Sequence, residues 1–267
     1  MTTSVKRALI LDCDGVLADT ERDGHLVAFN QTFRELDLPF QWSQEEYADL
    51  LKIGGGKERM LAYLRQHPEL DFGTPEEAAA KVAAAHKRKS AVYVELVEQG
   101  ALPGRPGVKR LIEAALDAGW QVAVASTSAT RSVEAVLLSV VGPDTRARIA
   151  GVWAGDIVPA KKPAPDIYLL TLRELGLSAD DAVVVEDSEA GAKAAAAAGL
   201  RHIVTVSSFT AEDPFPAAAV VVSDLGEPSA PARYLAGADI RQDGVVTVSS
   251  LERILSETPA PQASVPA

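Results

Sequence analysis

Residues 8–21 of the chain read Ala-Leu-Ile-Leu-Asp-Cys-Asp-Gly-Val-Leu-Ala-Asp-Thr-Glu. The apolar run that opens this stretch is too short for a helix and stops at Asp12, shortly before the turn-forming Gly15. We therefore predict a buried strand over residues 8–11. Side chains alternate along a strand, so Asp12 and Asp14 are expected to leave its carboxyl end toward the same side. An Asp-x-Asp pair by itself predicts little, because it also occurs in metal clamps and in solvated turns.

Similar apolar runs alternate with helical stretches along the rest of the chain. Strands are predicted over residues 121–125, 149–153, 182–185, 202–206 and 219–222. Helices are predicted over residues 108–118, 131–140, 165–175 and 188–198, and several of them stop at a glycine. Strand and helix repeated in this way predict an α/β fold, in which a mostly parallel sheet carries helices on both faces.

The segment between the first two predicted strands has a different pattern. Residues 22–101 carry Trp, Tyr, Leu and Met among charged residues at helical spacing, with little strand-like alternation. We predict that this segment is an all-helical domain inserted into an α/β core of residues 1–21 and 102–255. Residues 256–267 have no periodicity and are predicted to be a disordered tail.

Composition narrows the range of functions. The 267 residues include 47% hydrophobic residues, enough for a sizeable core, and no apolar window reaches the length of a membrane span. We expect a cytoplasmic monomer. The net charge of -11 argues against nucleic acid or an anionic membrane as a partner. Cys13 is the only cysteine in the sequence, so it is expected to pack in the core, and a cysteine-based metal site is excluded.

Three further polar clusters follow predicted strands. They are Ser126-Thr127-Ser128, Lys161-Lys162-Pro163 and Glu186-Asp187-Ser188. The carboxyl ends of parallel strands share one edge of a sheet, so these clusters are expected to meet Asp12 and Asp14 there. An acidic site binds a phosphate only with a cation present, which favours a bound Mg²⁺. Each cluster also has a structural interpretation, as helix caps, a solvated loop cation, or charges in a first helical turn.

The four clusters resemble, in order, the four motifs of the haloacid dehalogenase-like phosphohydrolases over essentially the whole chain. That resemblance implies a Rossmann-like core, and the helical insertion is similar to the small cap of the family. Residues 54–60 (Gly-Gly-Gly-Lys-Glu-Arg-Met) and 158–168 (Val-Pro-Ala-Lys-Lys-Pro-Ala-Pro-Asp-Ile-Tyr) look particularly like the CbbY group of the β-phosphoglucomutase-like branch. This group is associated with carbon-fixation operons and dephosphorylates xylulose 1,5-bisphosphate, which inhibits Rubisco. The resemblance therefore implies a phosphatase that acts on a small sugar bisphosphate.

The resemblance also implies a role for each matching residue. Asp12 attacks the phosphorus to form an aspartyl phosphate, and Asp14 protonates the leaving sugar oxygen and later takes a proton from water. Ser126 holds the phosphoryl oxygens and Lys162 balances their charge. Lys162 is preferred to Lys161 because the family lysine directly precedes proline. Mg²⁺, which prefers oxygen ligands, is expected on Asp12, the main-chain carbonyl of Asp14, Glu186 and Asp187.

Substrate selectivity is expected to come mainly from the helical insertion. Lys57 and Arg59 follow a glycine-rich loop at residues 54–56, whose exposed amide groups suit an anion such as a distal phosphate. His25 could equally be a partly buried helix residue without a role in binding, and Lys57 and Arg59 could equally be solvated residues at the start of a helix. The residues expected to bind substrate are Glu21, His25, Lys57, Arg59 and Thr127.

Two other functions fit the same clusters. A sugar-phosphate mutase uses the same aspartyl phosphate, but the chain lacks the lysine that β-phosphoglucomutases often carry after Ser126. A phosphoryl-accepting signalling receiver also combines an aspartate at a sheet edge with an acidic pair, a hydroxyl and a lysine. In receivers the acidic pair precedes the accepting aspartate, whereas Glu186 and Asp187 come last here. A phosphatase is therefore the function that the sequence favours.

Overall fold

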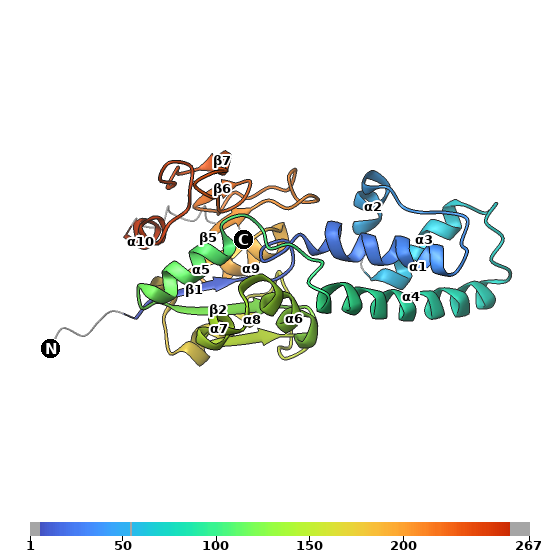
Figure 1. The fold of residues 1–267 in the computed structure, drawn as a ribbon, viewed down its shortest axis with the longest axis horizontal. Coiled ribbons are helices and arrows are strands. Elements are labelled where there is room, and N and C mark those ends of the chain that lie inside the picture. The colour runs from blue at the N-terminus through green and yellow to red at the C-terminus, as the bar shows by residue number, and fades with distance from the viewer. Residues whose placement is uncertain (1–5, 54, 257–267) are drawn as a thin grey trace, which may run out of the picture. The chain divides into compact units, whose positions relative to one another are not determined.

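The structure is a computed structural model that describes residues 6–53 and 55–256 (Figure 1). The chain divides into two compact units: an α/β unit of Met1–Asp19 with Pro103–Ala267, and a helical unit of Thr20–Leu102. The boundaries expected from the sequence follow Glu21 and Ala101. Ser256, expected to open the disordered tail, is instead the last residue of a helix, and residues 257–267 lie outside the described residues.

Within the described residues, seven strands form one sheet in the order β3-β2-β1-β4-β5-β6-β7. The strands are β1 (Ala8–Leu11), β2 (Gln121–Ser126), β3 (Gly151–Ala154), β4 (Ala182–Glu186), β5 (Arg201–Thr205), β6 (Val220–Val222) and β7 (Tyr234–Gly237). Neighbouring strands are parallel except for β6 and β7, which are antiparallel. The predicted mostly parallel sheet is therefore confirmed.

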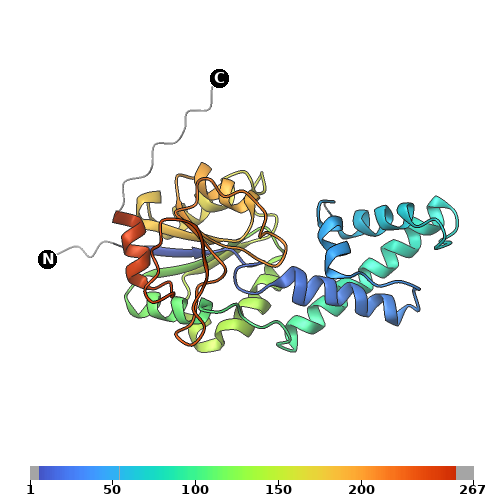
Figure 2. The same ribbon diagram turned by 90° about the horizontal axis from the view of Figure 1, so that it is seen from above.

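Strand β1 lies inside the sheet between β2 and β4 (Figure 2). All its residues are completely buried, which explains why the run is apolar on both faces. Leu11 pairs with Val124 of β2 and Val185 of β4. The amide of Asp12 extends this pairing by donating to the carbonyl oxygen of Val185 (3.0 Å). The carboxyl ends of β1, β2 and β4 are therefore aligned at one edge.

Helices pack on both faces of this sheet (Figure 1). They are α5 (Val108–Asp117), α6 (Thr130–Val141), α7 (Pro143–Arg148), α8 (Asp166–Leu175), α9 (Glu189–Ala197) and α10 (Val248–Ser256). Helices α8 and α9 contact each other, and Ile10 and Val184 join Tyr168 in the core beneath them. Helices α5 and α10 also contact each other and pack on β2 and β4. The strand ends are thus held by a core on each side of the sheet.

The sequence prediction lacks four elements of the described α/β unit, one of which is the three-residue 3₁₀-helix η2 (Ala179–Asp181). Strand β7 is exposed along its whole length, and its sequence Tyr-Leu-Ala-Gly shows no alternation of apolar and polar residues. Helix α7 has only six residues, and Ile149 is its C-cap, so β3 begins at Gly151 and not at residue 149. Helix α10 buries Ser250, Leu251 and Ile254, a stripe too short to stand out as periodic.

Among the described residues, the helical unit holds one π-helix and four α-helices. They are the π-helix η1 (Thr20–Leu26), then α1 (Val27–Glu35), α2 (Gln44–Leu51), α3 (Gly56–Gln66) and α4 (Pro75–Glu98). Aromatic rings form its core: the ring centroid of Trp42 lies 4.8 Å from that of Phe29 and 4.9 Å from that of Phe33. The predicted all-helical insertion is confirmed. Part of the predicted glycine loop, Gly54, lies outside the described residues.

Cys13, two residues after the end of β1, is buried, as expected. Burial raises the pKa of its thiol, and repulsion from Asp14 and Asp12 adds to the shift, so the thiol stays protonated.

Throughout residues 6–53 and 55–256, no helix combines the length and the apolar character needed to cross a membrane.

The long helix α4 begins with a capping box. The amide of Glu77 donates to the Thr74 hydroxyl (3.2 Å), and the amide of Thr74 donates to the Glu77 carboxylate (2.8 Å). Two amide groups that have no partner within the helix are thereby satisfied. Pro75 in the first turn adds a backbone already suited to the helix.

We expect Thr74→Ala to destabilise the helical unit, because the amide of Glu77 loses its acceptor. The expected loss in free energy of unfolding is about 1 kcal/mol. Urea unfolding followed by fluorescence of the buried Trp42, with Trp120 and Trp153 replaced by phenylalanine, measures it. Ser90→Ala, on the exposed middle of α4, is the matched control and should change stability by less than about 0.5 kcal/mol. Equal losses in the two variants would contradict a specific role of the cap.

Candidate active site

The end of β1, the end of β2, the end of β4 and the loop before α8 each contribute one polar group to a buried cluster. The Lys162 ammonium donates to Asp12 Oδ1 (2.6 Å), to Glu186 Oε1 (2.6 Å) and to the carbonyl oxygen of Ala125 (3.2 Å). The three charged side chains are at most 10% exposed. Residues far apart in the sequence thus share one cation in the protein interior.

The charges in this cluster strongly affect one another. Burial raises the pKa of Asp12 to about 7; Lys162 opposes this shift, whereas repulsion from Glu186 and Asp14 adds to it. Burial alone would lower the pKa of Lys162, but the carboxylates of Asp12 and Glu186 raise it well above its usual value. Lys162 is therefore a permanent cation, and it is the charge that allows Asp12 to ionise in a buried place.

Asp187 adds a third carboxylate to this place. Oxygen atoms of Asp12, Glu186 and Asp187 all lie within 4.8 Å of one another. Burial raises the pKa of Asp187 well above its usual value, and repulsion from Glu186 and Asp12 adds to the shift. One lysine does not offset three buried carboxylates, and a hard cation bound by oxygen would remove the remaining repulsion. The described residues therefore include a buried acidic cluster that fits a metal ion such as Mg²⁺.

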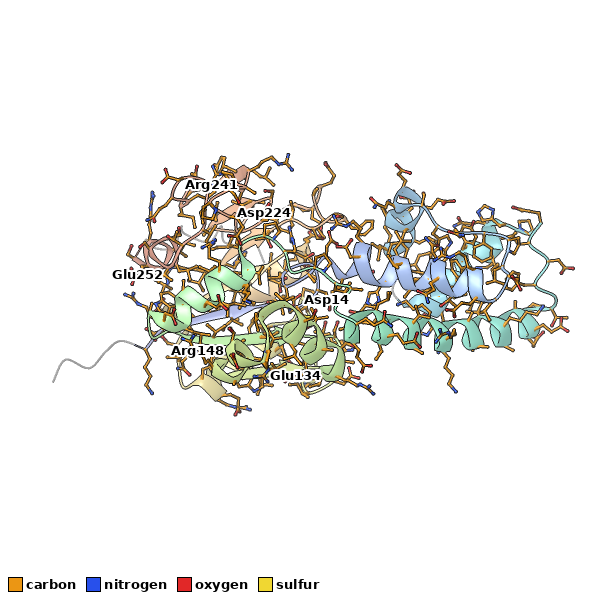
Figure 3. All side chains as sticks on the ribbon, in the orientation of Figure 1. Asp14, Glu134, Arg148, Asp224, Arg241 and Glu252 are labelled. Carbon is orange, nitrogen blue, oxygen red and sulfur yellow. The ribbon has the colours of Figure 1, made fainter. Side chains whose placement is uncertain are left out.

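Asp14 lies beside this cluster at the carboxyl end of β1 (Figure 3). Its carboxylate accepts a hydrogen bond from the hydroxyl of Ser128, and the Ser128 amide donates to the Ser126 hydroxyl (3.2 Å). Ser126 is buried as the last residue of β2, and Thr127 is half-buried between the two serines. Ser128 is not among the predicted site residues, although it lies two residues after Ser126 in the same polar cluster.

Two glycines let the carboxylates approach the backbone. Gly15 has a φ of +74°, and a Cβ at this position would overlap the Asp187 carboxylate. A Cβ at Gly191, in the first turn of α9, would overlap the Glu186 carboxylate. The close approach of these carboxylates therefore requires glycine at both positions.

Tyr168 on α8 contacts this buried cluster through Glu186 and Lys162. It is not among the predicted site residues. Its hydroxyl donates to Glu186 Oε1, and the Lys162 ammonium lies 4.9 Å from the centroid of its ring. Tyr168 is completely buried, so its hydroxyl needs a partner in the interior. The sequence signal for this contact was weak: Tyr168 lies shortly after Lys162, on the predicted helix over residues 165–175.

Arg105 holds the turn that follows β1. Its guanidinium donates to the carbonyl oxygens of Gly15, Thr205 (2.9 Å), Val206 (2.6 Å) and Ser223 (2.6 Å). These bonds tie the turn after β1 to the ends of β5 and β6. Arg105 is thus a structural support for the site, and the sequence contained no signal for it.

In the helical unit, Glu21 and Arg59 meet through Tyr47. The Tyr47 hydroxyl donates to Glu21 Oε2 (2.7 Å) and accepts from Arg59 (3.4 Å). Lys57 is exposed in the first turn of α3 and takes no part in these bonds. His25 contacts a lysine of α4 instead. Of the residues predicted to bind substrate in this unit, Glu21 and Arg59 are therefore linked through Tyr47. Lys57 and His25 take no part in these hydrogen bonds.

Comparison with known proteins identifies the family of this chain. Residues 6–199 match the family model of haloacid dehalogenase-like hydrolases. A CBBY-like protein of Arabidopsis thaliana is 46% identical over 228 residues, which cover 85% of this chain and 71% of the relative. A more distant relative, the β-phosphoglucomutase of Mycobacterium tuberculosis, is 31% identical over 245 residues, covering 83% of this chain and 90% of the relative.

A solved structure shares the fold at similar coverage. The crystal structure of a CbbY mutant from Rhodobacter sphaeroides in complex with xylulose 1,5-bisphosphate superposes with a TM-score of 0.67. Its sequence is 39% identical to this chain, and the match covers 82% of this chain and 94% of that one. The chain belongs to the haloacid dehalogenase-like hydrolases, within their CbbY group.

Proposed function

We propose that this protein is a Mg²⁺-dependent phosphatase that converts xylulose 1,5-bisphosphate to xylulose 5-phosphate and thereby removes an inhibitor of Rubisco. The observation that carries the proposal is the buried Asp12 carboxylate, held by Lys162 through one oxygen with Asp14 at the same strand end. The substrate is taken from the CbbY structure that contains xylulose 1,5-bisphosphate.

Asp12 is the proposed nucleophile. Lys162 occupies its Oδ1, which leaves Oδ2 to attack phosphorus. A bond forms between Oδ2 and phosphorus while the bond from phosphorus to the sugar oxygen breaks, and Asp14 gives its proton to that oxygen. Water then attacks the aspartyl phosphate, Asp14 takes a proton from it, and inorganic phosphate leaves with Asp12 restored. The Ser128 hydroxyl holds the Asp14 carboxylate in place for both transfers.

The remaining groups of the α/β unit are proposed to hold the phosphoryl oxygens. Ser126 and Thr127 follow β2, and Lys162 supplies a fixed positive charge. Asp12, Glu186, Asp187 and the main-chain carbonyl of Asp14 would bind Mg²⁺, which when bound neutralises charge on the phosphoryl oxygens. The donors fit, because all are oxygen atoms and the carboxylates are crowded enough to repel one another.

The helical unit is proposed to bind the rest of the substrate. Arg59 and Lys57 offer positive charge for the distal phosphate, and Arg59 is held in place by its bond to the carbonyl oxygen of Ile53 (3.0 Å). Glu21 and His25 offer an acceptor and a ring nitrogen for sugar hydroxyl or carbonyl groups. This division assigns chemistry to the α/β unit and recognition to the helical unit.

A sugar-phosphate mutase is the second candidate, favoured by the 31% identity to a β-phosphoglucomutase. It would use the same Asp12 chemistry but pass the phosphoryl group to a sugar hydroxyl in place of water. The two functions differ in the final acceptor and are separated by identifying the product.

The substrate can be tested by phosphate release from xylulose 1,5-bisphosphate, ribulose 1,5-bisphosphate and β-glucose 1-phosphate. We expect the fastest release from xylulose 1,5-bisphosphate with Mg²⁺ present, and none after chelation of the metal. Asp12→Asn should lower this rate at least about a thousandfold, because the nucleophile is lost. Formation of glucose 6-phosphate from β-glucose 1-phosphate in the presence of a priming bisphosphate, without phosphate release from xylulose 1,5-bisphosphate, would establish the mutase instead.

Lys161 and Lys162 form a matched pair for a second test. Lys162 is buried on Asp12, whereas Lys161 is exposed and pairs with Asp156 (2.6 Å). We expect Lys162→Met to lower kcat/KM at least about a hundredfold, because Asp12 and Glu186 lose their shared cation. Lys161→Met should stay within about twofold of the wild type.

Thermal unfolding of both lysine variants shows whether Lys162→Met remains folded, because removing one partner of a buried ion pair also destabilises a protein. A folded Lys162→Met variant with unchanged kcat/KM, or an equally large loss in Lys161→Met, would contradict the assigned role.

A further inference from the structure

The π-helix η1 carries two of the proposed substrate-binding residues. A π-helix is rare, and short π-helical segments occur often at functional sites. Its hydrogen bonds span five residues, so Glu21 and His25, four residues apart, lie almost one turn apart on the same side. Gly24 lets η1 pack closely on α4, because a Cβ there would lie only 2.8 Å from a ring carbon of Tyr93. The position of His25 is therefore set by this contact with α4.

The imidazole of His25 is held by two residues of α4. Its ring stacks on Tyr93, with ring centroids 4.1 Å apart and planes at 26°. Its Nδ1 atom lies 2.8 Å from the Lys89 ammonium nitrogen. Lys89 is itself 7% exposed, and its nitrogen lies 4.6 Å from the ring centroid of Phe29 and 5.4 Å from that of Tyr93. The rings favour the charged form of this lysine through cation–π attraction.

This contact restricts the protonation of the histidine. A lysine ammonium has three donor hydrogens and no acceptor, so Nδ1 of His25 has to be the acceptor of the bond. A histidine whose Nδ1 accepts carries its proton on Nε2 when neutral. We propose that Lys89 is a positioning residue that fixes His25 as a neutral imidazole protonated on Nε2, so that His25 donates a hydrogen bond to a carbonyl or phosphoryl oxygen of the substrate.

The charges around His25 act in the same direction. Lys89 and His86 of α4 and Arg59 of α3 face the ring, and Glu21 lies on the same helix as His25. Burial lowers the pKa of His25 well below its usual value, and charge repulsion with Lys89, Arg59 and His86 adds to this shift. An imidazolium is therefore disfavoured at neutral pH. The donor on Nε2 is thus present throughout the physiological range.

The proposed action on the substrate rests on the proposed function, whereas the protonation state can be measured without any substrate. Two-dimensional NMR of the full-length protein labelled with ¹⁵N-histidine distinguishes the two neutral tautomers and the imidazolium. The chain has four histidines, and the His25 signals are assigned as those missing from His25→Gln. Between about pH 6 and pH 8 we expect an unprotonated Nδ1, a protonated Nε2 and no titration.

Lys89→Met removes the ammonium but keeps a long side chain in the buried position. Loss of the nearby positive charge favours the imidazolium, so the His25 pKa should rise and the tautomer preference should weaken. Lys87→Met is the matched control, because Lys87 is exposed on the same helix, and it should leave the His25 signals unchanged. A wild-type His25 protonated on Nδ1, or unchanged His25 signals in a folded Lys89→Met variant, would overturn the proposal.

Kinetics tests the consequence for the substrate. With xylulose 1,5-bisphosphate, Lys89→Met should raise KM about tenfold, as expected for one lost hydrogen bond to a charged group, with a smaller change in kcat. Lys87→Met should change neither constant. An unchanged KM beside the expected NMR result would overturn the role in substrate binding. If the wild type did not hydrolyse xylulose 1,5-bisphosphate, the proposed substrate would fail while the NMR result still decided the protonation of His25.

Discussion

The candidate active site of the α/β unit depends on one interaction: the Lys162 ammonium shared between the buried carboxylates of Asp12 and Glu186. Buried charges are costly unless they are paired and hydrogen-bonded, so the surroundings must supply partners. Tyr168 donates to Glu186 from α8, and Gly15 and Gly191 leave the space that the carboxylates occupy. Strands β1 and β4 lie side by side and bring Asp12 and Glu186 together, α9 carries Gly191, and the loop before α8 supplies Lys162. The negative charge that remains suits the site to a metal ion, and a bound metal would in turn allow a phosphate to bind there.

Much of this arrangement could be predicted from the sequence, because apolar runs that end in polar clusters mark the edge of a parallel sheet. The pattern located Asp12, Ser126, Lys162 and Glu186 at that edge, and the structure brings all of them to the ends of β1, β2 and β4 or to the loop before α8. Contacts that depend on tertiary packing could not be predicted. The bond from Tyr168 to Glu186 requires the register of α8 against the sheet, which no local pattern encodes.

In the helical unit, too, local structure could be predicted from sequence patterns, whereas contacts between helices could not. Its helical character follows from the spacing of apolar residues, and a Thr-x-x-Glu capping box marks the start of its long helix. The π-helical turn at η1 has no periodic signature, although it sets the side on which His25 lies. The meeting of His25 with Lys89 joins residues on two helices, so the sequence alone left His25 open to a purely structural interpretation.

Asp12 is proposed to carry the phosphoryl group from the substrate to water. This role can be tested by rapid mixing of the wild-type enzyme with xylulose 1,5-bisphosphate and Mg²⁺, quenching in acid, and mass spectrometry of peptides. We expect a phosphoryl group on the peptide that contains Asp12, formed before phosphate is released and lost at the rate of that release. Phosphate release without any phosphorylated peptide, or with the phosphoryl group on another residue such as Ser126, would contradict it.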